Sequence, residues 1–194
     1  VRKKDSPSLE KDGSGARPFY RPSAFTNEFL NDPFDGGFNI EYVKDIGGKP
    51  LSYIINQTMM RIDLPSVLKS GEKVSFSLKW WYNIQDHVNQ DGRSGYESFK
   101  GDGNRTYIIA QFFPRMAVYN EVEGWQNHQF WGDGEFALPF GNYEVKITVP
   151  ADHILDATGE LQNRKEVFSK EMLKRYNRAK KTFDKPVLIV TQSE

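Results

Sequence analysis

Apolar and polar residues alternate along much of the chain between residues 38 and 163. The longest uninterrupted alternation runs over residues 74–82, and shorter ones run over residues 38–42, 58–64 and 143–149. A period of two places alternate side chains on opposite faces of an extended backbone. These stretches therefore predict half-buried β-strands, separated by turns that contain glycine, asparagine and aspartate.

The order of these stretches predicts antiparallel pairing. Residues 38–42 and 51–55 flank a turn at Gly47 and Gly48, which is a hairpin signature. Residues 106–113 are apolar on both faces, so we expect a central strand there. Further short strands are expected at residues 154–162 and at 187–190.

The period changes to 3.6 once, near the end of the chain. Phe168, Met172, Tyr176 and Ala179 form one apolar stripe, and Ser169 is a suitable N-cap, so a helix is predicted over about 168–181. Many strands and one helix indicate an all-β fold, an antiparallel β-sandwich or saddle-like sheet with one helix near the C-terminus. We expect this domain to span residues 37–194, preceded by an extended or partly disordered segment, rich in proline and glycine, at residues 1–36.

Composition excludes several classes of function. Lys plus Arg and Asp plus Glu each total 26, so no net field attracts nucleic acid or an anionic membrane. No apolar run approaches the roughly 20 residues of a membrane span, and the absence of cysteine rules out disulfides and thiolate metal sites. The chain begins without a methionine or a signal peptide, so we expect it to be a piece of a longer protein.

Candidate catalytic and metal-binding motifs are missing from the sequence. His87, His128 and His153 are not spaced as metal ligands, and no His-Glu-x-x-His or Gly-x-Ser-x-Gly pattern occurs. The glycine and acidic residues of 91–105 lack the donor spacing of a calcium loop and predict turns. We therefore expect no catalytic residue and no metal or cofactor site in this chain.

Aromatic residues make up 14% of the chain, and several gather in residues 111–131. Trp80 and Trp81 are neighbours in a predicted strand, so their side chains must point to opposite faces. One is expected in the core, and the other on a surface that meets a ligand or another domain. Exposed Trp and Tyr faces also suit sugar rings, so a carbohydrate-binding β-sandwich module is one alternative function. A structural interaction domain is another.

A longer resemblance emerges from the segments "IIAQFFPRMAVYNEVEGWQN" and "GDGEFALPFGNYEVKITVPADHILDATGEL". Together with the preceding "INQTMMRIDLP" and "LKSGEKVSFSLKW", and with "KPVLIV" near the end, they resemble the amino-terminal β-domain of bacterial zinc aminopeptidases of the aminopeptidase N type, the gluzincin class. The resemblance covers roughly residues 38–190 and rests on the order and spacing of the segments.

The resemblance implies a non-catalytic domain that packs on a separate, downstream catalytic domain, where the zinc of such an enzyme is bound. The β-domain of this family supplies one wall of the peptide substrate cleft from the strand end that matches residues 107–111. Gln111 fits this wall, and Tyr119 is a further candidate. Phe113 stands where the family has an acid or amide that binds the substrate's amine, and a phenyl ring cannot accept such a hydrogen bond.

The same resemblance assigns Arg115 a structural role, with Glu121 or Glu123 as the acidic partner. It implies an exported protein, in the periplasm or at the cell surface. Its expected partners are the catalytic domain of the same protein and a peptide substrate, with no nucleic acid and no membrane.

Overall fold

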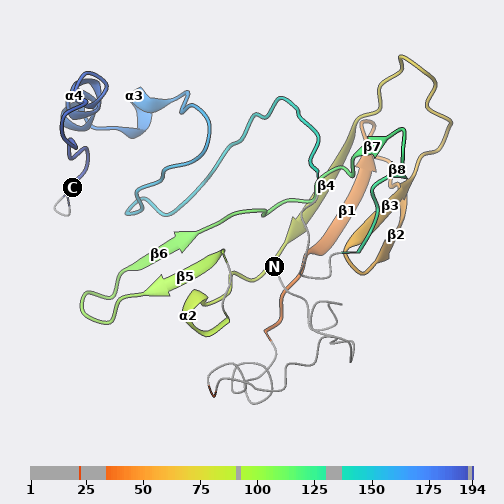
Figure 1. The fold of residues 1–194 in the computed structure, drawn as a ribbon, viewed down its shortest axis with the longest axis horizontal. Coiled ribbons are helices and arrows are strands. Elements are labelled where there is room, and N and C mark those ends of the chain that lie inside the picture. The colour runs from red at the N-terminus through yellow and green to blue at the C-terminus, as the bar shows by residue number, and fades with distance from the viewer. Residues whose placement is uncertain (1–21, 23–33, 91–92, 130–136, 192–193) are drawn as a thin grey trace. The chain divides into compact units, whose positions relative to one another are not determined.

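A computed structural model describes residues 22, 34–90, 93–129, 137–191 and 194 (Figure 1). The contacts divide the chain into two compact units, Val1–Gly141 and Asn142–Glu194. The dividing point falls inside residues 37–194, which the pattern predicts as one domain, and the predicted segment 1–36 lies largely outside the described residues.

The described part of unit 1 is built from four antiparallel strand pairs, β1–β4, β2–β3, β5–β6 and β7–β8, with a short helix α2 (Figure 1). Their bounds are β1 Asn39–Asp45, β2 Ser52–Asn56, β3 Met59–Asp63, β4 Phe76–Trp81, α2 His87–Gln90, β5 Gly95–Ser98, β6 Arg105–Ile108, β7 Tyr119–Asn120 and β8 Gly124–Trp125. The structure is therefore strand-rich with few helices, which confirms the coarse prediction of a mostly-β chain. Among the described residues the pairs are not joined into one larger sheet.

The β1–β4 pair holds the apolar centre of unit 1. Val43 of β1 lies opposite Leu78 and is almost completely buried, and Leu51 is buried beside it. The ring of Phe38 meets the rings of Trp80 and Tyr82 edge-on, at centroid distances of 6.3 and 5.6 Å. Burial in this environment raises the pKa of Tyr82, because a phenolate loses hydration there.

The predicted hairpin between residues 38–42 and 51–55 is wrong in its strand partner, although its turn forms. Gly48 N donates to the carbonyl of Asp45 at 3.0 Å, and Leu51 N donates to the carbonyl of Val43 at 2.9 Å. β2 then leaves β1 and pairs with β3 across a two-residue turn. The tight turn gives β2 a closer partner, and the longer apolar strand β4 takes the place beside β1.

The strand predicted over residues 106–113 forms only at its start, as β6, and its predicted central position is wrong. β6 ends at Ile108, pairs only with β5, and exposes all four of its residues. Two features stop it: Gln111 has a left-handed backbone with φ 52°, and Pro114 has no N–H to donate to a strand ladder. The apolar side chains of residues 106–113 therefore include exposed ones that the described part of unit 1 does not cover.

In unit 2 the predicted helix is confirmed as α4, Lys170–Ala179, preceded by the short helix α3, Arg164–Val167. Ser169 caps α4 as expected, because its hydroxyl accepts a 3.2 Å hydrogen bond from Met172 N, and Met172 is buried. The strands predicted at residues 143–149, 154–162 and 187–190 are not formed in the described part of unit 2. A strand needs a hydrogen-bonded neighbour, and the structure supplies none for these segments.

Candidate functional site

The chain changes character after β6, where it leaves the strand and becomes an irregular aromatic segment, residues 109–118. Gln111 lies at this point with φ 52°, a conformation that side-chain-bearing residues adopt at a cost of about 1–2 kcal/mol. Its side chain is exposed. A left-handed residue other than glycine, held at the surface, is a reason to suspect a functional role.

A hydrogen bond from β4 fixes the backbone that follows Gln111. The indole Nε1–H of Trp80 donates to the carbonyl oxygen of Phe112 at 3.1 Å. The ring of Phe112 meets that of Phe113 edge-on, with centroids 5.1 Å apart and an angle of 69° between the planes. Both phenyl rings are half-buried, so Phe113 presents part of its ring to solvent beside Gln111.

Arg115 lies next to Gln111, Phe112 and Phe113 because its side chain contacts the ring of Phe113. Its guanidinium carbon lies 5.6 Å from the centroid of Phe113, a cation–π distance. Within the described part of the chain Arg115 makes no ion pair with Glu121 or Glu123. Instead, the turn that holds these two acids is organised by Asn120, whose Oδ1 accepts from Val122 N at 3.0 Å and Glu123 N at 2.8 Å. Pairing of Arg115 with either glutamate stays a prediction.

Tyr119 lies in a separate small hairpin, β7–β8, and not in the Gln111 group. Its ring meets that of Trp125 edge-on at 5.3 Å and 72°. Tyr119 is 63% exposed and Trp125 54% exposed, so both offer ring surface to a ligand. Gly124 has φ 70° in this turn, which suits glycine.

Gln129, which follows the β7–β8 hairpin, is bonded to a distant turn, and sequence reasoning did not identify it. Its Oε1 accepts from Thr58 N at 3.0 Å and from Thr58 Oγ1 at 2.7 Å, while its Nε2 donates to the carbonyl of Asn56 at 3.0 Å. These bonds attach the chain just after the β7–β8 hairpin to the β2–β3 turn. A lone glutamine carries no sequence signal for such a contact, because the partner lies 71 residues away.

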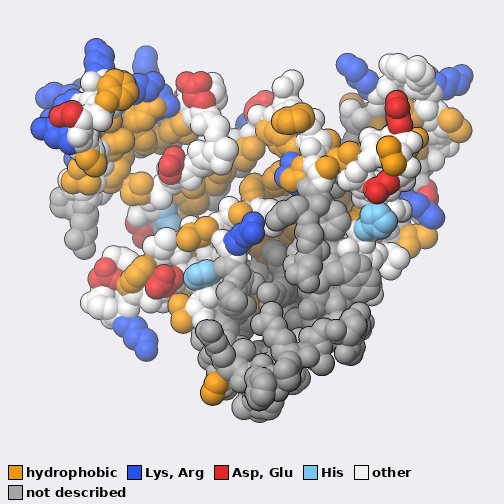
Figure 2. Space-filling model, viewed as in Figure 1, with side chains coloured by type: hydrophobic (Ala, Val, Ile, Leu, Met, Phe, Trp, Pro, Cys, Tyr) orange, Lys and Arg blue, Asp and Glu red, His pale blue; other side chains and the backbone are white. Residues whose placement is uncertain are grey.

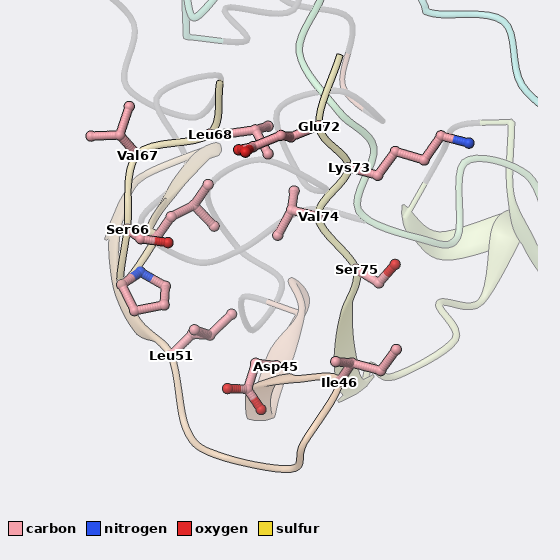
Figure 3. Close-up of a pocket in the computed structure, with 12 residues that line it drawn as sticks. Asp45, Ile46, Leu51, Ser66, Val67, Leu68, Glu72, Lys73, Val74 and Ser75 are labelled. Atoms are coloured by element: carbon pink, nitrogen blue, oxygen red, sulfur yellow. The ribbon is translucent and has the colours of Figure 1, made fainter. Parts of the chain in front are cut away.

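A hollow in unit 1 was also not predicted. It has a volume of about 420 Å³ and lies beside the β1 end, between the turn after β1 and the segment that leads into β4 (Figure 3). Its lining is mostly apolar, from residues that include Ile46, Leu64, Val67, Leu68 and Val74. Two acids on it support their own turns: Asp45 accepts from Lys49 N and Glu72 from Lys69 N, each at 2.8 Å.

Metal-binding and membrane-spanning features are not found in the described residues. Among those residues, no three side chains of His, Asp or Glu gather as metal ligands. No described helix is long and apolar enough to cross a bilayer. Comparison with protein-family models, with curated protein sequences and with solved structures gives no match for the chain.

Proposed function

We propose that this chain is a non-catalytic, amino-terminal β-domain of a zinc aminopeptidase-like metallopeptidase. In this proposal it packs on a separate catalytic domain and forms one wall of the peptide substrate cleft. The observation that carries the proposal is the exposed, left-handed Gln111, which follows the end of β6 in the segment where the family resemblance places this wall.

Gln111 suits such a wall because the backbone that follows it is fixed and an apolar ring lies beside it. The bond from Trp80 to Phe112 and the rigid ring of Pro114 hold the backbone on its C-terminal side. An amide side chain can both donate to and accept from the backbone of a bound peptide. Phe113 beside it offers apolar area and no polar partner, which favours an apolar first side chain of the substrate.

Exposed apolar side chains around this point support a partner domain. Ile108, Ile109 and Met116 flank Gln111 in the sequence, and each is about half exposed. Hydrophobic side chains reach the surface among charged ones over the strand pairs (Figure 2). Apolar surface of this kind marks places where another domain packs. In this proposal the separate strand pairs belong to the predicted antiparallel sandwich or saddle-like sheet.

The coding sequence downstream of residue 194 tests the class of protein. We expect a His-Glu-x-x-His motif followed by a glutamate, and an open reading frame without this motif would contradict the proposal. In the complete enzyme, Gln111→Ala should raise KM for aminoacyl-nitroanilide substrates severalfold and change kcat little. Gln57→Ala is the matched control, because Gln57 is also left-handed, with φ 51°, but lies in the β2–β3 turn. Equal KM values for both variants would contradict the assignment of Gln111 to the substrate wall.

A second candidate function rests on the Tyr119–Trp125 pair, whose exposed rings suit the faces of a sugar. A carbohydrate-binding module would lose glycan-array binding on Trp125→Ala. Val122→Ala is the control, because Val122 is exposed in the same hairpin and has no ring. A chain that fails both this test and the peptidase test would act as a structural interaction domain.

A further inference from the structure

Two cations of unit 2 lie over the ring of Tyr176 in α4. The guanidinium carbon of Arg164, the first residue of α3, lies 4.2 Å from the ring centroid, and the ammonium nitrogen of Lys180, the C-cap of α4, lies 5.1 Å from it. At these distances a ring face attracts a cation. Phe168, which ends α3, meets the same ring edge-on with centroids 6.0 Å apart. Two positive charges therefore meet at one aromatic side chain that α3 and α4 share.

Neither of these cations has an acidic partner in the described part of unit 2. The ion pairs of α4 there use other cations, Lys174 with Glu171 and Arg175 with Glu194. The Nε–H group of Arg164 is buried and has no hydrogen-bond acceptor among the described residues. A buried donor without an acceptor costs free energy, more so on a charged group, and an ion from outside the chain is one explanation for it.

The two positive charges also repel each other. Both lie within 5.1 Å of the same ring centroid, so they are closer together than one Debye length, roughly 10 Å at 0.1 M salt. The ring attracts each cation but leaves their total charge unchanged. Lys and Arg side chains gather over α4 in the view of Figure 2, which adds to the positive potential. An anion bound here would offset the repulsion and give Arg164 an acceptor.

A phosphate group fits this pair of cations better than a carboxylate does. A phosphate monoester carries a charge of about −1.5 to −2 near neutral pH, which matches two cations, whereas a carboxylate carries one negative charge. The planar guanidinium of an arginine can also donate two parallel hydrogen bonds to phosphate oxygens. The ammonium of a lysine binds phosphate as a point charge.

We propose that Arg164, Tyr176 and Lys180 form a phosphate-binding site on unit 2. Arg164 supplies the fork of N–H donors, Lys180 the second positive charge, and the hydroxyl on the Tyr176 ring a further donor. The ligand is a phosphate group, either free or at the end of a monoester. The site does not depend on the proposed peptidase role, because none of its residues belongs to the substrate wall, and its test uses the chain alone.

NMR titration of the nitrogen-15-labelled chain with inorganic phosphate, at constant ionic strength and near neutral pH, tests the proposal. We expect saturable shift changes in the amides of residues 164–168 and 176–181. Arg164→Gln and Lys180→Gln should each raise the Kd for phosphate by about threefold to tenfold, because each removes one charge-assisted contact. Lys180→Arg keeps the charge and should stay within about twofold of the wild type.

Lys174→Gln is the matched control, because it removes a cation of the same helix that pairs with Glu171. It should leave the Kd within about twofold of the wild type, as a surface charge outside the site would. Circular dichroism checks that every variant keeps α4. If Arg164→Gln disturbs the helix, the comparison of Lys180→Gln with Lys180→Arg decides alone.

Phenyl phosphate separates the two sources of the phosphate group. Tighter binding of phenyl phosphate than of inorganic phosphate would identify a monoester ligand, and equal or weaker binding would identify free phosphate; both support the site. Shift changes that chloride reproduces at the same ionic strength would overturn the proposal. An effect of Lys174→Gln as large as that of Lys180→Gln would also overturn it, since positive charge anywhere on α4 would then explain the binding.

Discussion

The indole N–H of Trp80 donates a 3.1 Å hydrogen bond to the carbonyl oxygen of Phe112, joining β4 to the residue that follows Gln111. The two partners are 32 residues apart, and the bond is partly buried. It is therefore a long-range link between the best-packed strand pair of unit 1 and the candidate substrate wall. A partly buried carbonyl that loses its donor is destabilising, which makes this contact testable.

Trp80→Phe should lower the free energy of unfolding by about 1–2 kcal/mol, because an aromatic ring is kept but the N–H donor is lost. The neighbouring Trp81→Phe is a matched control. Trp81 is 48% exposed, since alternation along β4 points it to the other face. Its replacement should change stability by less than about 0.5 kcal/mol, as expected for a surface position. Urea unfolding followed by circular dichroism measures both, and equal losses would contradict a specific role for the indole N–H.

How far the sequence predicted this arrangement depends on the range of the interaction. The N-cap Ser169 and the apolar stripe that begins at Phe168 predicted α4 correctly. Both signals depend on residues that are only a few positions apart in the sequence. Alternation also separated Trp80 from Trp81 correctly. The prediction of the strand that pairs with β1 was wrong. Pairing of β1 with β4 depends on competition among distant strands, which no local pattern encodes. The contact of Gln129 could not be predicted either, because its partner Thr58 lies 71 residues away.

Gly95 allows a second test, at the start of β5. A Cβ there would lie 2.7 Å from the carbonyl oxygen of Gln85, and Tyr96 N donates to that same oxygen at 2.8 Å. Its φ of 154° is also unfavourable for a side chain. Gly95→Ala should therefore destabilise the β5–β6 region by about 1–3 kcal/mol, the range for local backbone strain.

Gly101→Ala is the control for Gly95→Ala. It lies in the turn between β5 and β6, and an added Cβ there meets nothing within 4 Å. We expect its unfolding free energy to stay within about 0.5 kcal/mol of the wild type. Hydrogen exchange of the Tyr96 and Tyr107 amides should accelerate only in the Gly95 variant. Unchanged exchange there would show that the backbone moves away from the added methyl without loss.

Glu194 gives a prediction about pH. Its carboxylate accepts hydrogen bonds from Arg175 of α4 and from Thr191 N and Oγ1, and these lower its pKa from 4.5 to about 2. Since the folded pKa is the lower one, the stabilisation is complete above pH 4.5 and is lost as the pH falls toward 2. Glu194→Gln should make the helical signal of unit 2 less dependent on pH in that window. Glu160→Gln, a carboxylate outside α4, should reproduce the wild-type curve, and identical curves for all three proteins would exclude the contact in solution.

A substitution of Phe113 gives the most direct test of the substrate-wall proposal. Its ring is half-buried against Phe112 and has the Arg115 guanidinium 5.6 Å away. A carboxylate at this position would keep some contact with water and gain a nearby cation. Phe113→Glu should therefore lower the stability of the isolated chain by only about 1 kcal/mol, near the centre of measured single-mutant effects.

The double variant Phe113→Glu/Arg115→Gln should be less stable than the two single changes added together, because the new carboxylate then lacks its cation. If the proposed peptidase role holds, Phe113→Glu in the complete protein should strengthen binding of a substrate's free amine, through a charge-assisted hydrogen bond that a phenyl ring cannot make. Thermal melts of the chain and KM values of the enzyme measure the two effects. A loss of several kcal/mol in the chain would mean that the carboxylate is buried without a partner. Phe113 would then be a core residue, and its place in the substrate wall would have to be given up.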